Sequence, residues 1–178
     1  MNDECKLPGG DFKLELFKNK KEAGIDILSR IKKFFGLKIK LYAPLASVEV
    51  HNKMTNDSLA VLTGLAGNTG GYSAFTYLEV GTSNTAVSAS HTALQSAITD
   101  SGLARASATV SQIITAQTND TLKLTYNWTA SASKTIEEIG VFNASSSGTM
   151  LARALTGSVS VISGNVLVGT YTWRVVGN

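Results

Sequence analysis

The sequence predicts a mostly β protein, an antiparallel β-sandwich of about eight strands with two short helices, preceded by an N-terminal strand-helix arm. The first observation behind this prediction is that segments of alternating apolar and polar residues, separated by turn residues, recur at spacings of roughly 8–12 residues. The second is composition: 43% of the 178 residues are apolar and only 16% are charged, with Ser, Thr, Ala, Gly and Val filling the difference. We divide the chain into an arm, residues 1–37, and a sandwich domain, residues 38–178.

The arm begins with a strand and continues with a helix. Residues 11–17 (DFKLELF) alternate, which is typical of a short strand. Residues 19–38 carry apolar side chains at helical spacing and end near Gly36, which predicts a basic amphipathic helix of about four turns. The side chains predicted to dock this helix on a partner are Ile25, Leu28, Arg30, Ile31, Lys32, Lys33, Phe34 and Phe35.

The helix has three possible environments: its own domain, a partner protein or a membrane surface. Membrane binding has the least support, because Glu22 and Asp26 interrupt the cationic face. Packing against the domain or a partner is preferred, so the arm is interpreted as an anchoring segment. We therefore expect a chain that lacks residues 1–36 to retain a folded domain.

Charge is distributed unevenly along the chain. The formal net charge is +3, but residues 1–55 contain 11 Lys and Arg against 7 Asp and Glu, whereas residues 56–178 contain 5 against 6. The domain therefore lacks the basic footprint of a nucleic-acid-binding protein. No segment approaches the roughly 20 apolar residues of a membrane span. The sequence predicts neither nucleic acid nor membrane as a partner.

An edge strand and a helix are expected next. Residues 38–50 alternate around Pro44, which cannot donate to a ladder, so this segment is an edge strand or a bend. Residues 52–67 contain a capping residue, Thr55 or Asn56, followed by leucines at helical spacing. The expected buried face of this helix consists of Leu59, Leu62 and Leu65.

Residues 77–107 organise the rest of the chain. A strand ends at Gly81, and a polar loop follows it. From Ser90, a plausible N-cap, one or two helical turns are expected, with Leu94 and Ile98 on one face and Gly102 closing the turn.

The remaining sequence predicts strands separated by turns. A bulge is expected near Gly140, and the last two strands are expected to pair around the turn 163–165. Tyr171 and Trp173 are interpreted as core anchors rather than as a sugar-binding platform. The predicted strand segments are 103–117, 121–130, 135–143, 150–155, 158–162 and 166–176.

Side chains that could act in catalysis or bind a metal are few, and they lie far apart in the sequence. His51 and His91 are isolated, and neither has a neighbour at metal-ligand spacing. The adjacent Glu137 and Glu138 point to opposite faces of a strand and cannot act as a carboxylate pair. Cys5 is the only cysteine, so no intrachain disulfide is possible. We therefore expect a protein that is not an enzyme, with no catalytic, cofactor-binding or metal-binding residues and no cofactor.

An ordered set of short motifs resembles a domain of tailed-bacteriophage virion proteins, of the tail-collar-fibre and head-decoration (turret) type. The family's usual form is an E/R-E-x-G-L-F segment followed by G-x-x-L-x-A/F-R, which the second half resembles with EEIGVF at 137–142 and GTMLAR at 148–153. The resemblance covers roughly residues 45–176. The matching segments are 51–56 (HNKMTN), 59–65, 77–82 (YLEVGT), 90–94 (SHTAL), 135–143 (TIEEIGVFN) and 148–153 (GTMLAR).

The resemblance implies a β-sandwich that assembles on a virion as a symmetric oligomer, with a homotrimer as the first expectation. The implied partners are further copies of the chain and the major capsid protein or tail- and portal-associated virion proteins, with assembly in the host cytoplasm. Capsid decoration is preferred over a tail or collar fibre, because the chain is short and has no shaft-forming repeat. A host carbohydrate- or receptor-binding module is the alternative from a different class.

Overall fold

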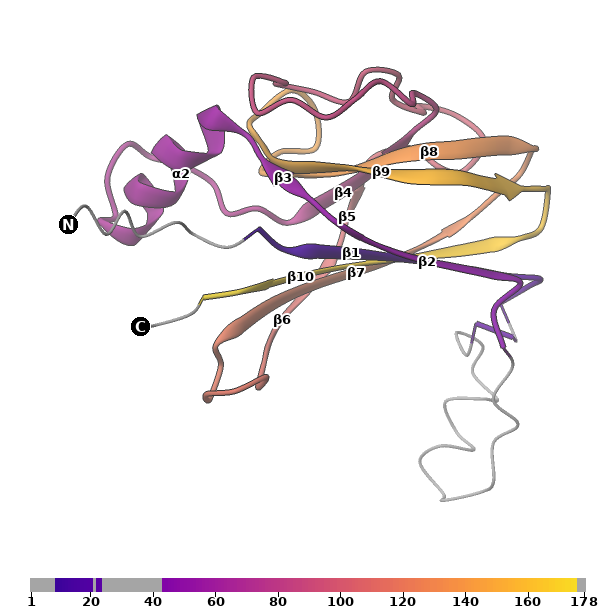
Figure 1. Cartoon of the computed structure of the whole chain (residues 1–178), viewed down its shortest axis with the longest axis horizontal. Helices are drawn as coiled ribbons and strands as arrows, with labels where there is room; N and C mark the ends of the chain where they lie inside the picture. Colours follow the sequence, from indigo (N-terminus) through magenta and orange to yellow (C-terminus); the bar gives the residue numbers. More distant parts are fainter. Residues whose placement is uncertain (1–8, 21, 24–42, 176–178) are drawn as a thin grey trace.

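The computed structural model describes residues 9–20, 22–23 and 43–175. These residues form two five-stranded antiparallel sheets and one α-helix (Figure 1). Sheet A has the strand order β2-β1-β10-β7-β6, and sheet B has the order β3-β9-β8-β4-β5. The sandwich class is therefore confirmed, with ten strands where about eight were predicted. The strands are β1 (Asp11–Phe17), β2 (Ala46–His51), β3 (Lys53–Met54), β4 (Tyr77–Gly81), β5 (Ala106–Ser107), β6 (Thr109–Ile113), β7 (Thr121–Thr129), β8 (Lys134–Phe142), β9 (Met150–Val161) and β10 (Val166–Arg174).

The core lies between the inner faces of the two sheets. Because side chains alternate along a strand, each sheet contributes every second residue to it. Trp128 and Tyr171 are buried there, as expected for Tyr171, and Tyr171 packs on Phe12 with ring centroids 4.8 Å apart. Burial raises the pKa of the Tyr171 hydroxyl. Trp173 is only partly buried and packs against this core. Typical core residues are Leu14, Leu124 and Leu167 from sheet A and Leu78, Val80, Ile139, Val141 and Ala154 from sheet B.

Strand β1 belongs to the sandwich and not to a separate arm. It pairs with β10 on one side and with β2 on the other, and its apolar residues Phe12, Leu14 and Leu16 are buried. The assignment of residues 11–17 to an arm is therefore wrong, because a seven-residue strand with a fully apolar face is stabilised most by the interior of a sheet. Removal of residues 1–36 would delete β1, which lies between β2 and β10 in sheet A. A chain that lacks these residues is therefore not expected to fold.

Both lateral edges of the sandwich are formed by segments that pass from one sheet to the other. At one edge, β2 of sheet A is followed after a single residue by β3 of sheet B. At the opposite edge, β5 of sheet B is followed after a single residue by β6 of sheet A. The edge position predicted for the strand after Pro44 is confirmed by β2.

The helix α2 (Asn56–Ala66) is present as predicted, but its buried face differs. The N-cap is Thr55, whose Oγ1 accepts a hydrogen bond from the Ser58 N–H at 3.3 Å and donates to the Met150 carbonyl oxygen. This contact with β9 sets the rotation of the helix, so the buried residues are Ser58, Val61 and Gly64. Leu59 and Leu65 are exposed, whereas Leu62 is partly buried against the core, so the predicted leucine face is wrong at two of its three positions.

The second predicted helix is absent from residues 90–98, which form turns and irregular backbone. The N–H groups of Gln95 and Ser96 donate to the Glu138 carboxylate instead of to helical carbonyls. The Ile98 N–H donates to the Val80 carbonyl at 3.0 Å. The N–H groups of this segment therefore bind acceptors on β8 and β4 and not the carbonyl oxygens of a helix. The short apolar pattern was not sufficient to specify a helix.

The strands β8 and β9 form the irregular centre of sheet B. Register shifts occur between Ile136 and Glu138 and between Val141 and Phe142, which agrees with the irregularity expected near Gly140. The segments 150–155 and 158–162 form one continuous strand, β9. The predicted pairing of the last two strands is wrong, because β9 lies in sheet B and β10 in sheet A.

Candidate functional site

The outer face of sheet B is covered by the long connection of residues 82–105, between β4 and β5 (Figure 1). Most of this connection has no helix or strand, and a single β-bridge joins its Ala97 to Gly81. Exposed loops of this length are uncommon unless they are functional or anchored by their own contacts. The contacts under this loop make it the first candidate for a functional site.

The loop is anchored by a buried ion pair. Glu138 on β8 and Arg153 on β9 are both fully buried, and Arg153 Nε donates to Glu138 Oε2 at 2.6 Å. The same carboxylate accepts hydrogen bonds from the Ser96 N–H at 2.7 Å and the Gln95 N–H at 3.1 Å. A buried charge requires such partners, because the protein interior solvates it poorly. One carboxylate therefore joins β8, β9 and the loop.

Arg153 also contacts a second part of the loop, through one of its terminal nitrogens. Its Nη1 donates to the Thr85 carbonyl oxygen at 3.0 Å and lies 3.3 Å from His91 Nδ1. The Ser88 N–H also donates to His91 Nδ1, at 3.3 Å. Since both neighbours of Nδ1 are donors, the ring proton lies on Nε2. Within the described part of the chain, Arg153 Nη2 has no hydrogen-bond partner.

Glycine permits the close approach of the loop to the sheet. A Cβ at Gly81 would lie 2.5 Å from Glu138 Oε1 and 2.6 Å from the Ser96 carbonyl oxygen. Both distances are too short for any side chain. Gly81 therefore makes room for the carboxylate and for the loop backbone that binds it.

A second Glu–Arg pair holds the neighbouring turn. Arg105 Nη2 donates to Glu79 Oε2 at 2.9 Å, and both side chains are mostly buried. Its Nη1 donates to the carbonyl oxygens of Ala144 at 3.1 Å and Ser147 at 2.8 Å, in the turn between β8 and β9. The guanidinium lies 3.6 Å from the centre of the Phe142 ring. The turn and the end of the loop are thus fixed to the same sheet face.

A small apolar cluster completes this face. Leu94 of the loop packs on Phe142 and Met150, and Tyr77 lies against them. Leu94 was predicted to lie with Ile98 on one face of a short helix; both side chains are buried, although no helix forms.

These groups can support the fold but present no exposed acid, base or nucleophile. Both carboxylates are paired with a guanidinium, and Glu138 receives two further N–H donors. Glu137 accepts a hydrogen bond from the Ser158 hydroxyl, whereas Glu138 is buried. Ile136 and Ile139 both lie in the core, and a register shift separates Ile136 from Glu138, so the strict alternation behind the prediction of opposite faces does not hold here. We therefore assign this site a structural role, which is to fix the outer layer on sheet B.

Among the described residues, neither histidine belongs to a group of side chains that could hold a metal ion. His51 is exposed and contacts Asp11, and His91 belongs to the loop anchor. Within the ranges that the structure describes, no group of three or more His, Cys, Asp or Glu side chains could hold a metal ion.

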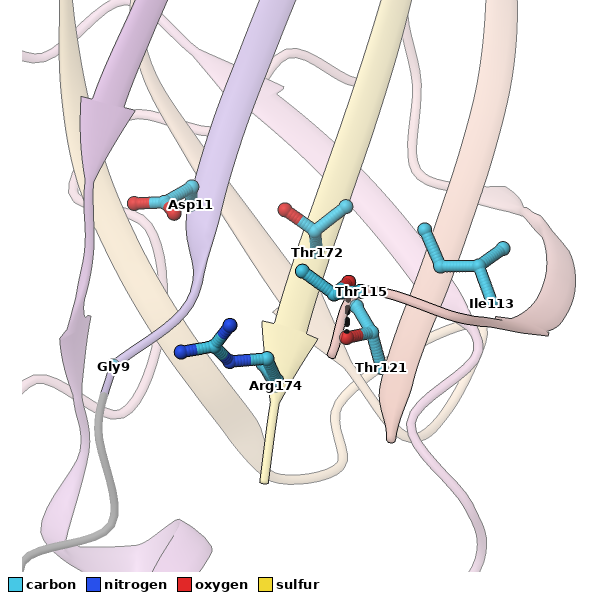
Figure 2. Close-up of a pocket in the computed structure, with 7 residues that line it drawn as sticks. All are labelled: Gly9, Asp11, Ile113, Thr115, Thr121, Thr172 and Arg174. Atoms are coloured by element: carbon cyan, nitrogen blue, oxygen red, sulfur yellow. Dashed lines mark hydrogen bonds between the residues drawn. The ribbon is translucent and has the colours of Figure 1, made fainter. Parts of the chain in front are cut away.

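A shallow pocket of about 320 Å³ lies on the outer face of sheet A (Figure 2). It brings together a carboxylate, a guanidinium and three threonine hydroxyls, and no aromatic ring lines it. The hydroxyls of Thr115 and Thr121 are 2.7 Å apart. Among the described residues Arg174 forms no ion pair, although the Asp11 carboxylate lines the same pocket. The lining residues are Gly9, Asp11, Ile113, Thr115, Thr121, Thr172 and Arg174.

The predicted docking residues, Ile25 to Phe35, lie outside the described residues. The structure instead brings together residues that sequence reasoning had not connected: Glu79 with Arg105, and Glu138 with Arg153. A signal for the second pair existed, because segment 135–143 contains the acidic residues Glu137 and Glu138, and Arg153 is the one charged residue of segment 148–153. Charged residues inside otherwise apolar strands are rarely buried unless paired, so each predicts a partner of opposite charge.

Comparisons of the chain with protein-family models, with curated proteins and with solved structures gave no match. In the described ranges no helix is long and apolar enough to span a membrane.

Proposed function

We propose that the chain is a non-enzymatic structural protein of a tailed-bacteriophage virion that decorates or stabilises the capsid as an oligomer. The observation that carries this proposal is where the motifs of the resemblance lie. Segments 77–82, 90–94, 135–143 and 148–153 meet at the outer face of sheet B, and their charged residues Glu138 and Arg153 bind each other. The motif residues are therefore used to build a rigid surface.

Rigidity is the property that a shell protein needs. A surface whose loops are already fixed loses less conformational entropy when it docks on a neighbour, so more of the contact energy remains for binding. A covering loop of residues 82–105 that is held by a buried ion pair meets this requirement. Capsid decoration remains preferred over a tail or collar fibre, since the sandwich has no shaft.

Immunogold electron microscopy tests the proposal. Antibodies raised against the purified protein would be applied to density-purified phage particles from cells that carry the gene. Regular labelling of heads is the expected result. Labelling confined to tails would replace capsid decoration by the fibre alternative, and unlabelled particles that lack the protein by mass spectrometry would refute the virion assignment.

The pocket of Figure 2 favours a second candidate, a carbohydrate- or receptor-binding module. Hydroxyl groups, a carboxylate and a guanidinium are suitable hydrogen-bonding partners for a polar ligand such as a sugar acid. A glycan array with the purified protein tests it, with Arg174→Ala as the pocket variant and Lys123→Ala on β7 as the control outside the lining. Specific binding that only Arg174→Ala abolishes would support this candidate, whereas no binding, or equal loss in both variants, would contradict it.

A further inference from the structure

The strand β6 is an edge of sheet A without the usual protection against pairing. Its sequence, TVSQI, contains no charge, no proline and no glycine, and four of its five residues are exposed. β7 occupies one side of the strand. On the other side, no backbone hydrogen bond joins β6 to any other described residue. A row of free N–H and C=O groups on a β-branched strand is a template for another strand.

The opposite edge of the sandwich is protected by charge. Exposed residues along β2 and β3 include Glu49, His51 and Lys53. Charged side chains on an edge discourage pairing with a further strand. The contrast between the two edges indicates that the free side of β6 is available for pairing with another strand.

The structure also presents β6 in a fixed position. The β6–β7 hairpin extends beyond the body of the sandwich (Figure 1). Its connection is closed by Asp120, whose carboxylate accepts hydrogen bonds from the N–H groups of Thr115, Ala116 and Gln117 at 2.9–3.0 Å. The Asp120 carbonyl oxygen accepts a further hydrogen bond from the Val175 N–H. The edge is therefore held by its own turn and by the end of β10.

Exposed apolar side chains accompany the edge. Val110 is 45% exposed and Ile114, just past the strand, is 68% exposed. Two such side chains beside free backbone groups would be shielded from water by an added strand.

We propose that β6 pairs in antiparallel orientation with β6 of a second copy of this chain, across a two-fold axis at Ser111. The register places Val110 opposite the partner's Gln112 and Ser111 opposite the partner's Ser111. A two-fold contact must be self-complementary, and TVSQI meets this condition because it brings no like charges together. The whole chain carries a formal net charge of only +3, so two copies also repel each other little. The contact joins two five-stranded sheets into one continuous sheet.

This inference is independent of the virion proposal. A two-fold contact joins copies in pairs, and the threefold assembly implied by the resemblance would use another surface. The mass of the assembled particle is then an even multiple of the chain mass of 18.7 kDa.

Charge placed at the two-fold axis tests the pairing. Size-exclusion chromatography with light scattering would be applied to the full chain and to the variants Ser111→Lys and Ser111→Glu. Each variant alone places like charges opposite each other, so its mass is expected to fall to half that of the unmodified protein. A mixture of the two variants is expected to restore the full mass, because the pair across the axis then has opposite charges.

Ser47→Lys is the matched control, since Ser47 is an exposed serine on the opposite edge strand β2. It is expected to leave the mass unchanged, and circular dichroism should show equal folding of all variants. An unmodified protein that stays monomeric at every concentration would overturn the proposal. So would an oligomer whose mass is the same with Ser111→Lys, or one whose mass falls equally with Ser47→Lys.

Discussion

The two outer faces of this sandwich use charge in opposite ways. On sheet B, Glu138 and Arg153 are fully buried beneath a covering loop. On sheet A, Lys13 and Glu15 lie 3.0 Å apart, with side chains that are 44% and 25% exposed. The separations are similar, but the surroundings differ, and burial decides the energetic consequence of losing one partner. In water the remaining charge is solvated, whereas under the loop it is not.

The largest effect is expected for Arg153→Met. This change leaves Glu138 buried without its counter-charge, which should lower the free energy of unfolding by about 3–5 kcal/mol. Urea denaturation at neutral pH measures this loss. The double variant Glu138→Gln with Arg153→Met should be more stable than Arg153→Met alone, because no unpaired charge is buried. A double variant that is less stable than Arg153→Met would contradict this account of the pair.

A smaller loss is expected for Arg105→Ala. The side chain binds Glu79 and the carbonyl oxygens of Ala144 and Ser147, and its removal should cost about 2–3 kcal/mol. Arg105→Lys keeps the charge but cannot reach all three partners, so it should fall between alanine and the unmodified protein. The midpoint of urea unfolding orders the three proteins, and equal midpoints for lysine and arginine would show that geometry is unimportant here.

A pH-dependent effect is expected for Asp120, at the turn of the projecting hairpin. Although desolvation opposes the charged form, the N–H groups of Gln117, Ala116 and Thr115 and the Thr121 hydroxyl lower the pKa of Asp120 below its ordinary value of 3.8. A lowered folded-state pKa stabilises the fold above pH 3.8, and this contribution is lost as the pH falls through the folded-state value. Asp120→Asn should therefore have a lower Tm than the unmodified protein at pH 7, with the difference shrinking near pH 2. A difference that is constant between these pH values would contradict the assignment.

The smallest effect is expected for Lys13→Ala on the open face of sheet A. The ion pair with Glu15 is exposed to water, so its loss should change the free energy of unfolding by about 0–0.5 kcal/mol. The same urea measurements give this value, and high salt should remove most of it. A loss comparable to that of Arg153→Met would show that the two faces do not differ as the structure indicates.

Local patterns predicted the strands best where alternation was strict. The segment 11–17 coincides with β1, and the segment 121–130 corresponds closely to β7, because period-two alternation is a property of the strand itself. The segment 90–98 failed because its apolar residues fit a helix, whereas its N–H groups found acceptors on Glu138. In α2 the cap was predicted and the buried face was not, since the contact of Thr55 with Met150 sets the rotation.

The candidate site was less predictable than the fold. Alternation predicted opposite faces for Glu137 and Glu138, but a register shift between Ile136 and Glu138 interrupts it, and alternation contains no information on which face is covered. The pocket between Asp11, Thr115 and Arg174 combines residues from the two ends of the chain with the β6–β7 turn, and no motif joins them.

By itself, the sequence determined the class of the fold, the positions of most strands and the capped helix. These follow from steric and hydrophobic rules that act over a few neighbouring residues. Only the tertiary structure decided that β1 is a central strand, that β9 and β10 belong to different sheets, and that Glu138 binds Arg153 beneath a loop. Those outcomes depend on partners far apart in the chain, and their energies exist only once the partners are brought together and water is excluded.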